Sequence, residues 1–177
     1  GHVAILTGSP DIGGSRASMA LMASEVLGVP FEHIHPQVAA TDAVGHTDLT
    51  GGSRTTLATG QAVIQAAEQC VAELCRRAAA EWEVEPGLVT WSQGAAHYDD
   101  QSLTFEELAS RAGAMGGPLT FSSSLTSTST APGFGVHICD VEVDKDTGRT
   151  TITRYTVIQD AGKAVHPDYV EGQMQGG

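Results

Sequence analysis

A glycine-containing loop near the start of the chain has the composition of an anion site. Residues 8–15 read Gly-Ser-Pro-Asp-Ile-Gly-Gly-Ser and lie between a short β-rich run, residues 3–7, and a helix expected over residues 16–27. Glycines let the backbone approach a ligand closely, and the free amides at the start of a helix attract anions. A tight strand-to-helix turn with Ser15 as the N-cap would explain the same residues without a ligand.

A second segment, residues 50–56, reads Thr-Gly-Gly-Ser-Arg-Thr-Thr. It precedes the strongest helix pattern in the chain, which begins at Thr59 or Gly60 and runs to Glu83. Its four hydroxyls, flexible glycines and one arginine can together donate hydrogen bonds to phosphate oxygens. The alternative is a solvated loop in which Thr or Ser caps the following helix.

A third segment lies near the end of the sequence. Residues 160–167 read Asp-Ala-Gly-Lys-Ala-Val-His-Pro, and residues 171–173 read Glu-Gly-Gln. Asp160, Gly162 and His166 suit a turn that needs no ligand. Chemistry alone therefore predicts a turn here.

The composition and net charge of the chain exclude some classes of binding partner. The 177 residues are 41% hydrophobic and 17% charged, which is enough apolar material for one substantial core. A net charge of -12 argues against binding to nucleic acid or to anionic lipid. No apolar run approaches the roughly 20 residues of a membrane span, and no signal peptide is visible. We expect a cytoplasmic protein, although a fragment could have lost an export signal.

The metal-binding residue types are scattered. Cys70, Cys75 and Cys139 lack the spacing of a zinc site or a disulfide framework, so three buried structural thiols are expected. His33 and His35 are the only close pair of histidines, and they share one face if residues 31–36 form a strand. Because no third ligand lies nearby in the sequence, we expect a solvated strand edge rather than a metal site.

The elements that must position these segments are of mixed type. Besides the two helices, the sequence predicts a hairpin over residues 88–98 with a Gln93-Gly94 turn. A helix then opens with a capping box formed by Thr104 and Glu107. A long polar loop covers residues 37–58.

The last third of the chain is expected to be mainly β-structure. Two β-rich runs, residues 133–143 and 150–158, flank a turn suited to an antiparallel hairpin. In the first run, the face with His137, Cys139, Val141 and Val143 is the better candidate for the core. Residues 118–131 fit either a strand or a mobile connector. These elements predict an α+β fold, with antiparallel hairpins packed against long helices, rather than a regular βαβ winding.

Taken together, the order and spacing of the three segments resemble the molybdopterin-binding large subunit of the xanthine dehydrogenase/aldehyde oxidase family. The likeness covers almost the whole chain. In that family the first loop usually reads Asp/Glu-x-Gly-Gln-Gly, whereas Gly14 stands here in place of the glutamine, so a side-chain donor is missing. The cofactor-binding residues that the resemblance implies are Gly13 and Gly14 against the dithiolene and metal, Thr50, Gly52, Ser53 and Thr55 (with Arg54 as an addition) against the pterin and pyrophosphate, and Gln173 from the start of a helix.

The resemblance also implies a function. Family members are oxidoreductases that hydroxylate an aldehyde or an N-heterocycle such as a purine at a molybdenum-molybdopterin centre, whose pterin carries a cytosine dinucleotide in some forms. Electrons pass to 2Fe-2S clusters and FAD on partner subunits or domains. Residues 1–177 are then a single fragment of the molybdopterin-binding domain, with a sub-lobe junction near residues 118–132.

A fragment should lack part of this machinery. The family's catalytic glutamate is expected beyond Gly177, so no residue here is assigned a catalytic or metal-ligating role, and the fragment alone should be inactive. Surfaces that meet the rest of the large subunit should be exposed, which favours dimerisation or disorder in residues 37–58 and 118–131. The alternative functions are a non-catalytic module that binds a phosphate or a nucleotide, and a structural domain of an assembly.

Overall fold

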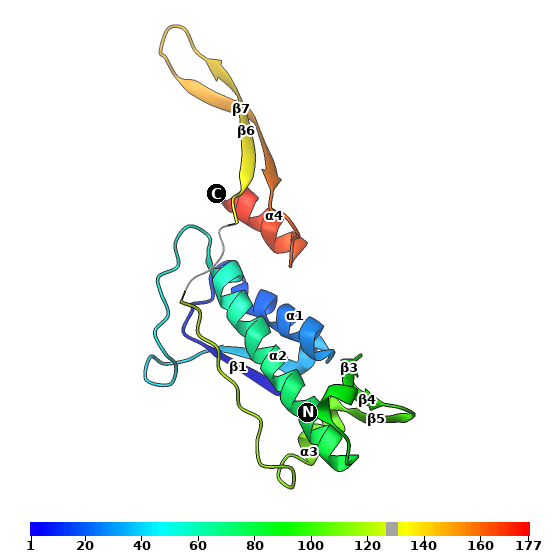
Figure 1. Cartoon of the computed structure of the whole chain (residues 1–177). Coiled ribbons are helices and arrows are strands. Elements are labelled where there is room, and N and C mark those ends of the chain that lie inside the picture. Colours follow the sequence, from blue (N-terminus) through cyan, green and yellow to red (C-terminus); the bar gives the residue numbers. More distant parts are fainter. Residues whose placement is uncertain (127–130) are drawn as a thin grey trace. The chain divides into compact units, whose positions relative to one another are not determined.

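The computed structural model describes residues 1–126 and 131–177. They form two compact units, a first unit from Gly1 to Thr128 and a second unit from Ser129 to Gly177 (Figure 1). The expectation of a strand or connector over residues 118–131 falls partly outside the described residues, at 127–130. Its described part, residues 118–126 and residue 131, contains no helix or strand.

The first unit begins with a β-α-β arrangement. Strand β1 (Val3–Thr7) leads to helix α1 (Ser15–Leu27), and β1 pairs in parallel with β2 (Ile34–Val38), with Val3 opposite Ile34. This is one isolated β-α-β unit, because the other two sheets of the described residues are antiparallel, so the predicted α+β class holds. The strand expected over residues 31–36 is displaced, because Phe31–His33 form a 3-10 turn, η1, before β2 starts.

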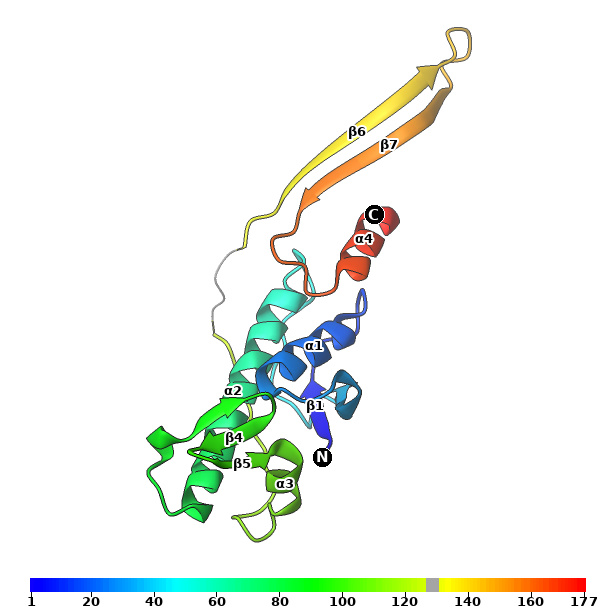
Figure 2. The same ribbon diagram turned by 90° about the vertical axis from the view of Figure 1, so that its right-hand side faces the viewer.

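Helix α2 (Thr55–Glu81) is the longest element, and it lies against α1 (Figure 2). It starts four residues before Thr59, the earlier of the two expected starts, so the end of the second segment is helical. The two helices come close at Gly60, where an added Cβ would lie 2.5 Å from the sulfur of Met22. The core of the unit includes the almost fully buried side chains of Met19, Leu74 and Leu108.

A small antiparallel sheet completes the first unit. Strands β3 (Thr90–Ser92), β4 (Ala95–Tyr98) and β5 (Gln101–Thr104) follow the 3-10 turn η2 (Pro86–Leu88) and precede helix α3 (Phe105–Ser110).

Two local sequence patterns in and beside this sheet, the Gln93-Gly94 turn and the capping box of α3, are confirmed. Gln93 and Gly94 have φ values of 50° and 73°, as a two-residue type I′ turn requires. Thr104 and Glu107 form the reciprocal bonds of the capping box.

The second unit is a long hairpin and one helix. Strand β6 (Phe134–Val143) pairs with β7 (Thr150–Asp160), and helix α4 (Pro167–Gly176) follows. Asp144 closes the hairpin turn by accepting from the amides of Asp146 and Thr147 at 2.9 and 2.8 Å. The antiparallel hairpin predicted from the sequence is therefore present.

The core face expected on this hairpin is not buried. Every residue of β6 is exposed, including Val141 and Val143 at 50% and 56%. A two-stranded hairpin cannot bury its own faces, and α4 reaches only part of β7, where Tyr155 and Val157 lie. Cys139 is exposed for the same reason, so the expectation of a buried thiol is wrong there.

Cys70 and Cys75 are half-buried on α2, not fully buried as expected. Burial raises the pKa of the Cys70 thiol to about 11 and also raises the pKa of Cys75, so both are unreactive neutral thiols near pH 7. In the described part of the chain, no helix is long and apolar enough to cross a membrane.

Candidate functional site

The first glycine loop needs its two consecutive glycines for backbone reasons. Gly13 and Gly14 have φ values of 60° and 72°, in the left-handed region that side chains disfavour. Gly14 is the N-cap of α1, and no side chain caps it directly. The interpretation with Ser15 as the N-cap is therefore wrong: Ser15 is the first helical residue, and its hydroxyl donates to the carbonyl of Pro10 at 3.4 Å.

Asp11 already occupies the start of α1. One of its carboxylate oxygens accepts from the Arg16 amide at 3.0 Å, and the other accepts from Arg16 Nε at 2.7 Å. Hydrogen bonds from Arg16 hold the pKa of Asp11 below its ordinary value. The carboxylate of Asp11, which precedes α1, thus already accepts from an amide in the first turn of this helix.

Some of the remaining backbone amides of this loop donate hydrogen bonds, and others do not. Ser15 N donates to the carbonyl of Ile12 at 3.2 Å, and Ala17 N donates to the carbonyl of Gly14 at 3.0 Å. Within the described chain, the amides of Gly13 and Gly14 make no hydrogen bond. The two glycine amides, and not the helix start as a whole, are what this loop can offer to a ligand.

The second segment has the opposite arrangement, because nothing caps α2. The N-cap is Arg54, no side chain bonds to the first turn, and the preceding Gly52 and Ser53 both have positive φ. In the described residues, the amides of Thr55 and Thr56 have no acceptor. The full dipole of a 27-residue helix therefore faces a loop rich in hydroxyls.

Arg54 is engaged within its own loop. Its Nη1 atom lies 3.3 Å from a carboxylate oxygen of Asp48 and 3.4 Å from the carbonyl of Leu49. It therefore holds residues 48–54 together instead of pointing a free charge at a ligand.

The first segment contacts helix α2, which follows the second segment, and also contacts the loop after β2, through residues to which the sequence gave no role. The hydroxyl oxygens of Ser9 and Thr59 lie 2.8 Å apart, and Ser9 is only 7% exposed. An added Cβ at Gly8 would lie 2.4 Å from the Thr47 hydroxyl, so the loop that follows β2 packs closely against the first loop. A buried serine beside a glycine is too common a pattern to reveal such a contact in advance.

The third segment lies in the second unit and closes a turn of its own. Asp160 ends β7 and accepts from the Gly162 amide at 2.8 Å, and Gly162 has a φ of 62°. Helix α4 begins at Pro167, so Gln173 is exposed in the seventh position of the helix and not at its start, as the resemblance implied.

His166 is the unusual residue of this segment. Its ring stacks on Tyr169 with centroids 3.8 Å apart and an interplanar angle of 7°. Its Nδ1 atom is buried and makes no hydrogen bond to the described residues. The sequence suggested only a turn residue here.

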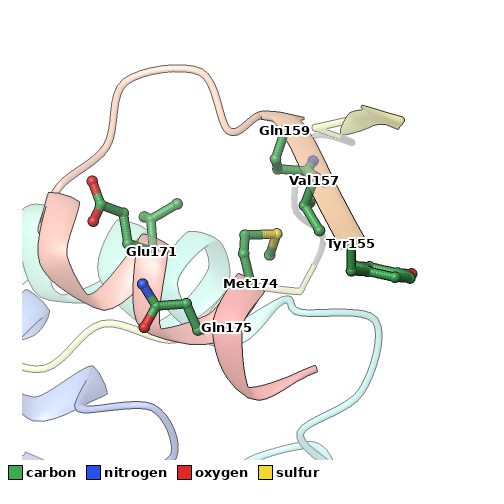
Figure 3. A pocket seen from close by; sticks show the side chains of 7 residues that line it. Tyr155, Val157, Gln159, Glu171, Met174 and Gln175 are labelled. Carbon is green, nitrogen blue, oxygen red and sulfur yellow. The ribbon is translucent and has the colours of Figure 1, made fainter. Parts of the chain in front are cut away.

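A groove separates β7 from α4 within the second unit (Figure 3). Its volume is about 610 Å³, and the sequence did not predict it. Gln173 does not line it. The lining side chains are Tyr155, Val157 and Gln159 from β7, and Val170, Glu171, Met174 and Gln175 from α4.

Several carboxylates accept hydrogen bonds from other groups of the chain, and these bonds shift their pKa values. Among the described carboxylates with a shifted pKa, the shift is downward in each case, because hydrogen bonds stabilise the ionised form. These residues are Asp11, Glu73, Glu107 and Asp144. A general base near neutral pH would need a raised carboxylate pKa. No group of three His, Cys, Asp or Glu side chains in the described residues is placed to hold a metal ion.

Comparison with known proteins gives the family. All of residues 1–177 match the family described as "Molybdopterin cofactor-binding domain". The carbon monoxide dehydrogenase large chain of Hydrogenophaga pseudoflava is 27% identical over 173 residues, which cover 93% of this chain and 21% of that protein. Xanthine dehydrogenase of Drosophila subobscura is 30% identical over 179 residues, which cover 99% of this chain and 13% of that protein.

A solved structure is also similar to this chain. A crystal structure of Cu,Mo-CO dehydrogenase in its carbon monoxide reduced state matches with a TM-score of 0.80 and 26% identity, covering 99% of this chain and 23% of that one. The chain thus spans less than a quarter of the length of each of these proteins. The α+β fold and the family resemblance predicted from the sequence are both confirmed. The chain belongs to the molybdopterin cofactor-binding domain family.

Proposed function

We propose that this chain forms part of the cofactor site of a molybdenum hydroxylase, as a segment of its large subunit. The observation that carries the proposal is the Ser9–Thr59 bond, which joins the first glycine loop to the start of α2, the helix that follows the second glycine-rich loop. Each loop ends at a helix start and leaves backbone amides free. Loops of this kind suit a ligand with several anionic oxygens.

The two loops fit different parts of the cofactor. The paired amides of Gly13 and Gly14 suit the compact end with the dithiolene and metal, because no side chain there blocks a close approach. The uncapped start of α2, with the hydroxyls of Ser53 and Thr55, suits a diphosphate. We therefore favour a dinucleotide form of the cofactor, such as the cytosine form. Thr50 and Gly52 belong to the same loop, whereas the assignment of Gln173 rests on the family motif alone.

When bound, the molybdenum centre supplies the chemistry: hydroxylation of an aldehyde or an N-heterocycle with oxygen derived from water. This chain's own residues bind and orient the cofactor, and electrons leave to 2Fe-2S and FAD partners. Asp11 holds the first loop in shape through Arg16. Gly14 offers a backbone donor where relatives with glutamine offer a side-chain donor as well.

The test uses the full-length protein and measures three quantities: molybdenum by mass spectrometry, pterin by fluorescence, and the nucleotide released by mild acid. Thr55→Val and Ser53→Ala should lower all three together, because both lose hydroxyls at the α2 start. Thr120→Val, which removes an exposed hydroxyl from a segment without helix or strand, is the matched control. Full cofactor loading in both variants would contradict the assignment of this segment.

One observation also supports a second candidate. An uncapped helix start binds phosphate groups in general, so a non-catalytic module that holds a nucleotide would use the same loop. The same measurements separate the two candidates, because such a module would release a nucleotide and contain neither molybdenum nor pterin.

A further inference from the structure

Three histidines that are separate in the sequence come together at one end of the two-stranded parallel sheet. His2 immediately precedes β1, His33 ends η1, and His35 lies in β2. The ring centroids of His33 and His35 are each 5.3 Å from that of His2. The sequence offered no third imidazole near His33 and His35, and the parallel register of β1 and β2 supplies it.

The geometry of one pair is close to that of a chelate. His35 Nε2 and His2 Nδ1 are 3.2 Å apart. Two imidazole nitrogens bound to one tetrahedral zinc ion, with Zn–N distances of about 2.0–2.1 Å, lie about 3.3 Å from each other. Without an ion this distance is that of a hydrogen bond between the two rings, and binding would require both nitrogens to turn their lone pairs toward the ion.

The backbone keeps this pair on the solvent side of the sheet. Ile34, the neighbour of His35, is buried in the core at 4% exposure, and alternation along β2 directs His35 to the opposite face. The residue opposite His35 in the register is Ala4, whose small side chain leaves room beside the His35 ring. An ion could thus reach the pair without any rearrangement of the core.

We propose that His2 and His35 form a two-imidazole site for a divalent transition metal of the zinc and copper type, with water completing the coordination. Neutral imidazole is a good ligand for these ions. The bound ion would join the start of β1 to β2, across 33 residues of sequence, and so brace the strand that runs into the Gly8 loop. This site is separate from the molybdopterin residues and does not depend on their assignment.

The test is a titration of the full chain, without a histidine tag and after chelator treatment, with Zn²⁺ in a calorimeter and Cu²⁺ in an EPR spectrometer. We expect one equivalent of Zn²⁺ to bind and the Cu²⁺ spectrum to show coupling to two imidazole nitrogens. His2→Gln and His35→Gln should each weaken binding by roughly 10- to 100-fold or more, since loss of a ligand costs at least as much as loss of a supporting contact.

Two further variants make the result specific. His97→Gln changes a histidine on β4 and should bind Zn²⁺ as the parent does. His33→Gln should also retain binding, and a loss equal to that of His35→Gln would overturn the two-ligand assignment. The Tm should rise with Zn²⁺ in the parent and stay constant in His35→Gln. Equal affinity in the parent, His2→Gln and His35→Gln would overturn the proposal, as would the absence of any binding to the parent.

Discussion

The hydroxyl groups of Ser9 and Thr59 lie 2.8 Å apart, and this bond joins the glycine loop after β1 to the first turns of α2. Ser9 is 7% exposed, so water cannot easily replace its partner. The contact ties the first loop that we propose for the cofactor to the helix that follows the second loop. It is therefore a point at which stability and cofactor content should change together.

Replacing either hydroxyl should show this coupling. Ser9→Ala and Thr59→Val should each lower the free energy of unfolding by about 0.5–1.5 kcal/mol, and the double variant should lose less than the sum. Urea denaturation of the four proteins measures the cycle, and molybdenum content measures its effect on the site. Ser123→Ala, which removes an exposed hydrogen bond to Gln65, is the control. Strict additivity would mean that the Ser9–Thr59 bond does not stabilise the fold.

The double-glycine turn before α1 should not tolerate a side chain freely. Gly14 has a φ of 72°, so Gly14→Ala should cost about 1–2 kcal/mol of unfolding free energy. Gly113→Ala is the control, because an added Cβ at Gly113 meets nothing within 4 Å and its φ is not positive.

Gly14→Gln should lose the same backbone stability and also add the side-chain donor that the family resemblance implies at this position. Comparison of Gly14→Gln with Gly14→Ala in the full-length protein therefore isolates the donor. A hydrogen bond to a charged centre is worth about 1.5–3 kcal/mol, so turnover per molybdenum should differ by roughly 10- to 100-fold between the two. Identical turnover would show that position 14 does not face the reacting centre.

A negative charge at the start of α2 should separate stability from cofactor binding. Thr56→Asp places a carboxylate in the uncapped first turn and should raise the stability by about 0.3–1 kcal/mol through the helix dipole. The same charge should repel a diphosphate, so molybdenum and nucleotide content should fall. Thr56→Asn is the neutral control of the same shape. Unchanged cofactor content in Thr56→Asp would place the diphosphate elsewhere.

Glu73 should make the stability of the first unit depend on acid pH. Its carboxylate binds Arg76 and the buried Arg77, and hydrogen bonds from these arginines lower the pKa of Glu73 to about 2. Because the pKa is lower in the folded state, Glu73 stabilises the fold above its unfolded pKa of about 4.3, and this contribution is lost as the pH falls toward 2.

Glu73→Gln removes the negative charge beside the buried Arg77 guanidinium, whose other hydrogen bond among the described residues goes to the carbonyl of Gly117. We expect a loss of about 1–3 kcal/mol at pH 7, with the difference from the parent shrinking between pH 4 and pH 2. Glu68→Gln, at an exposed position on the same helix, should change little. Denaturation midpoints across this pH range provide the measurement, and a constant difference from pH 7 to pH 2 would contradict the assignment.

The isolated chain of 177 residues should not turn over an aldehyde or a purine. The shifted carboxylates among its described residues all have lowered pKa values. The chain also spans less than a quarter of the length of the relatives it matches, so we expect it to supply only part of a cofactor site. Electron transfer from candidate substrates to a dye, with and without reconstituted cofactor, is the assay. Cofactor-dependent turnover by this chain alone would place a general base within it.

The sequence alone determined the features that depend on neighbours within a few residues. The capping box of Thr104 and Glu107, the Gln93-Gly94 turn and the end of α1 at Gly28 all follow from local backbone preferences and short-range hydrogen bonds. The order of the three glycine segments also predicted the family correctly. Such signals are readable because the interacting atoms are close along the chain.

The tertiary structure decided what those segments can offer. Asp11 fills the start of α1, whereas the start of α2 remains open, and composition could not distinguish the two. The Ser9–Thr59 and His2–His35 contacts join residues 50 and 33 positions apart, which only the packing of β1, β2 and α2 brings together. The β6–β7 hairpin has the alternation of a buried strand pair, yet most residues on both of its faces remain exposed. Burial depends on what covers a surface, and a strand's own sequence does not contain that information.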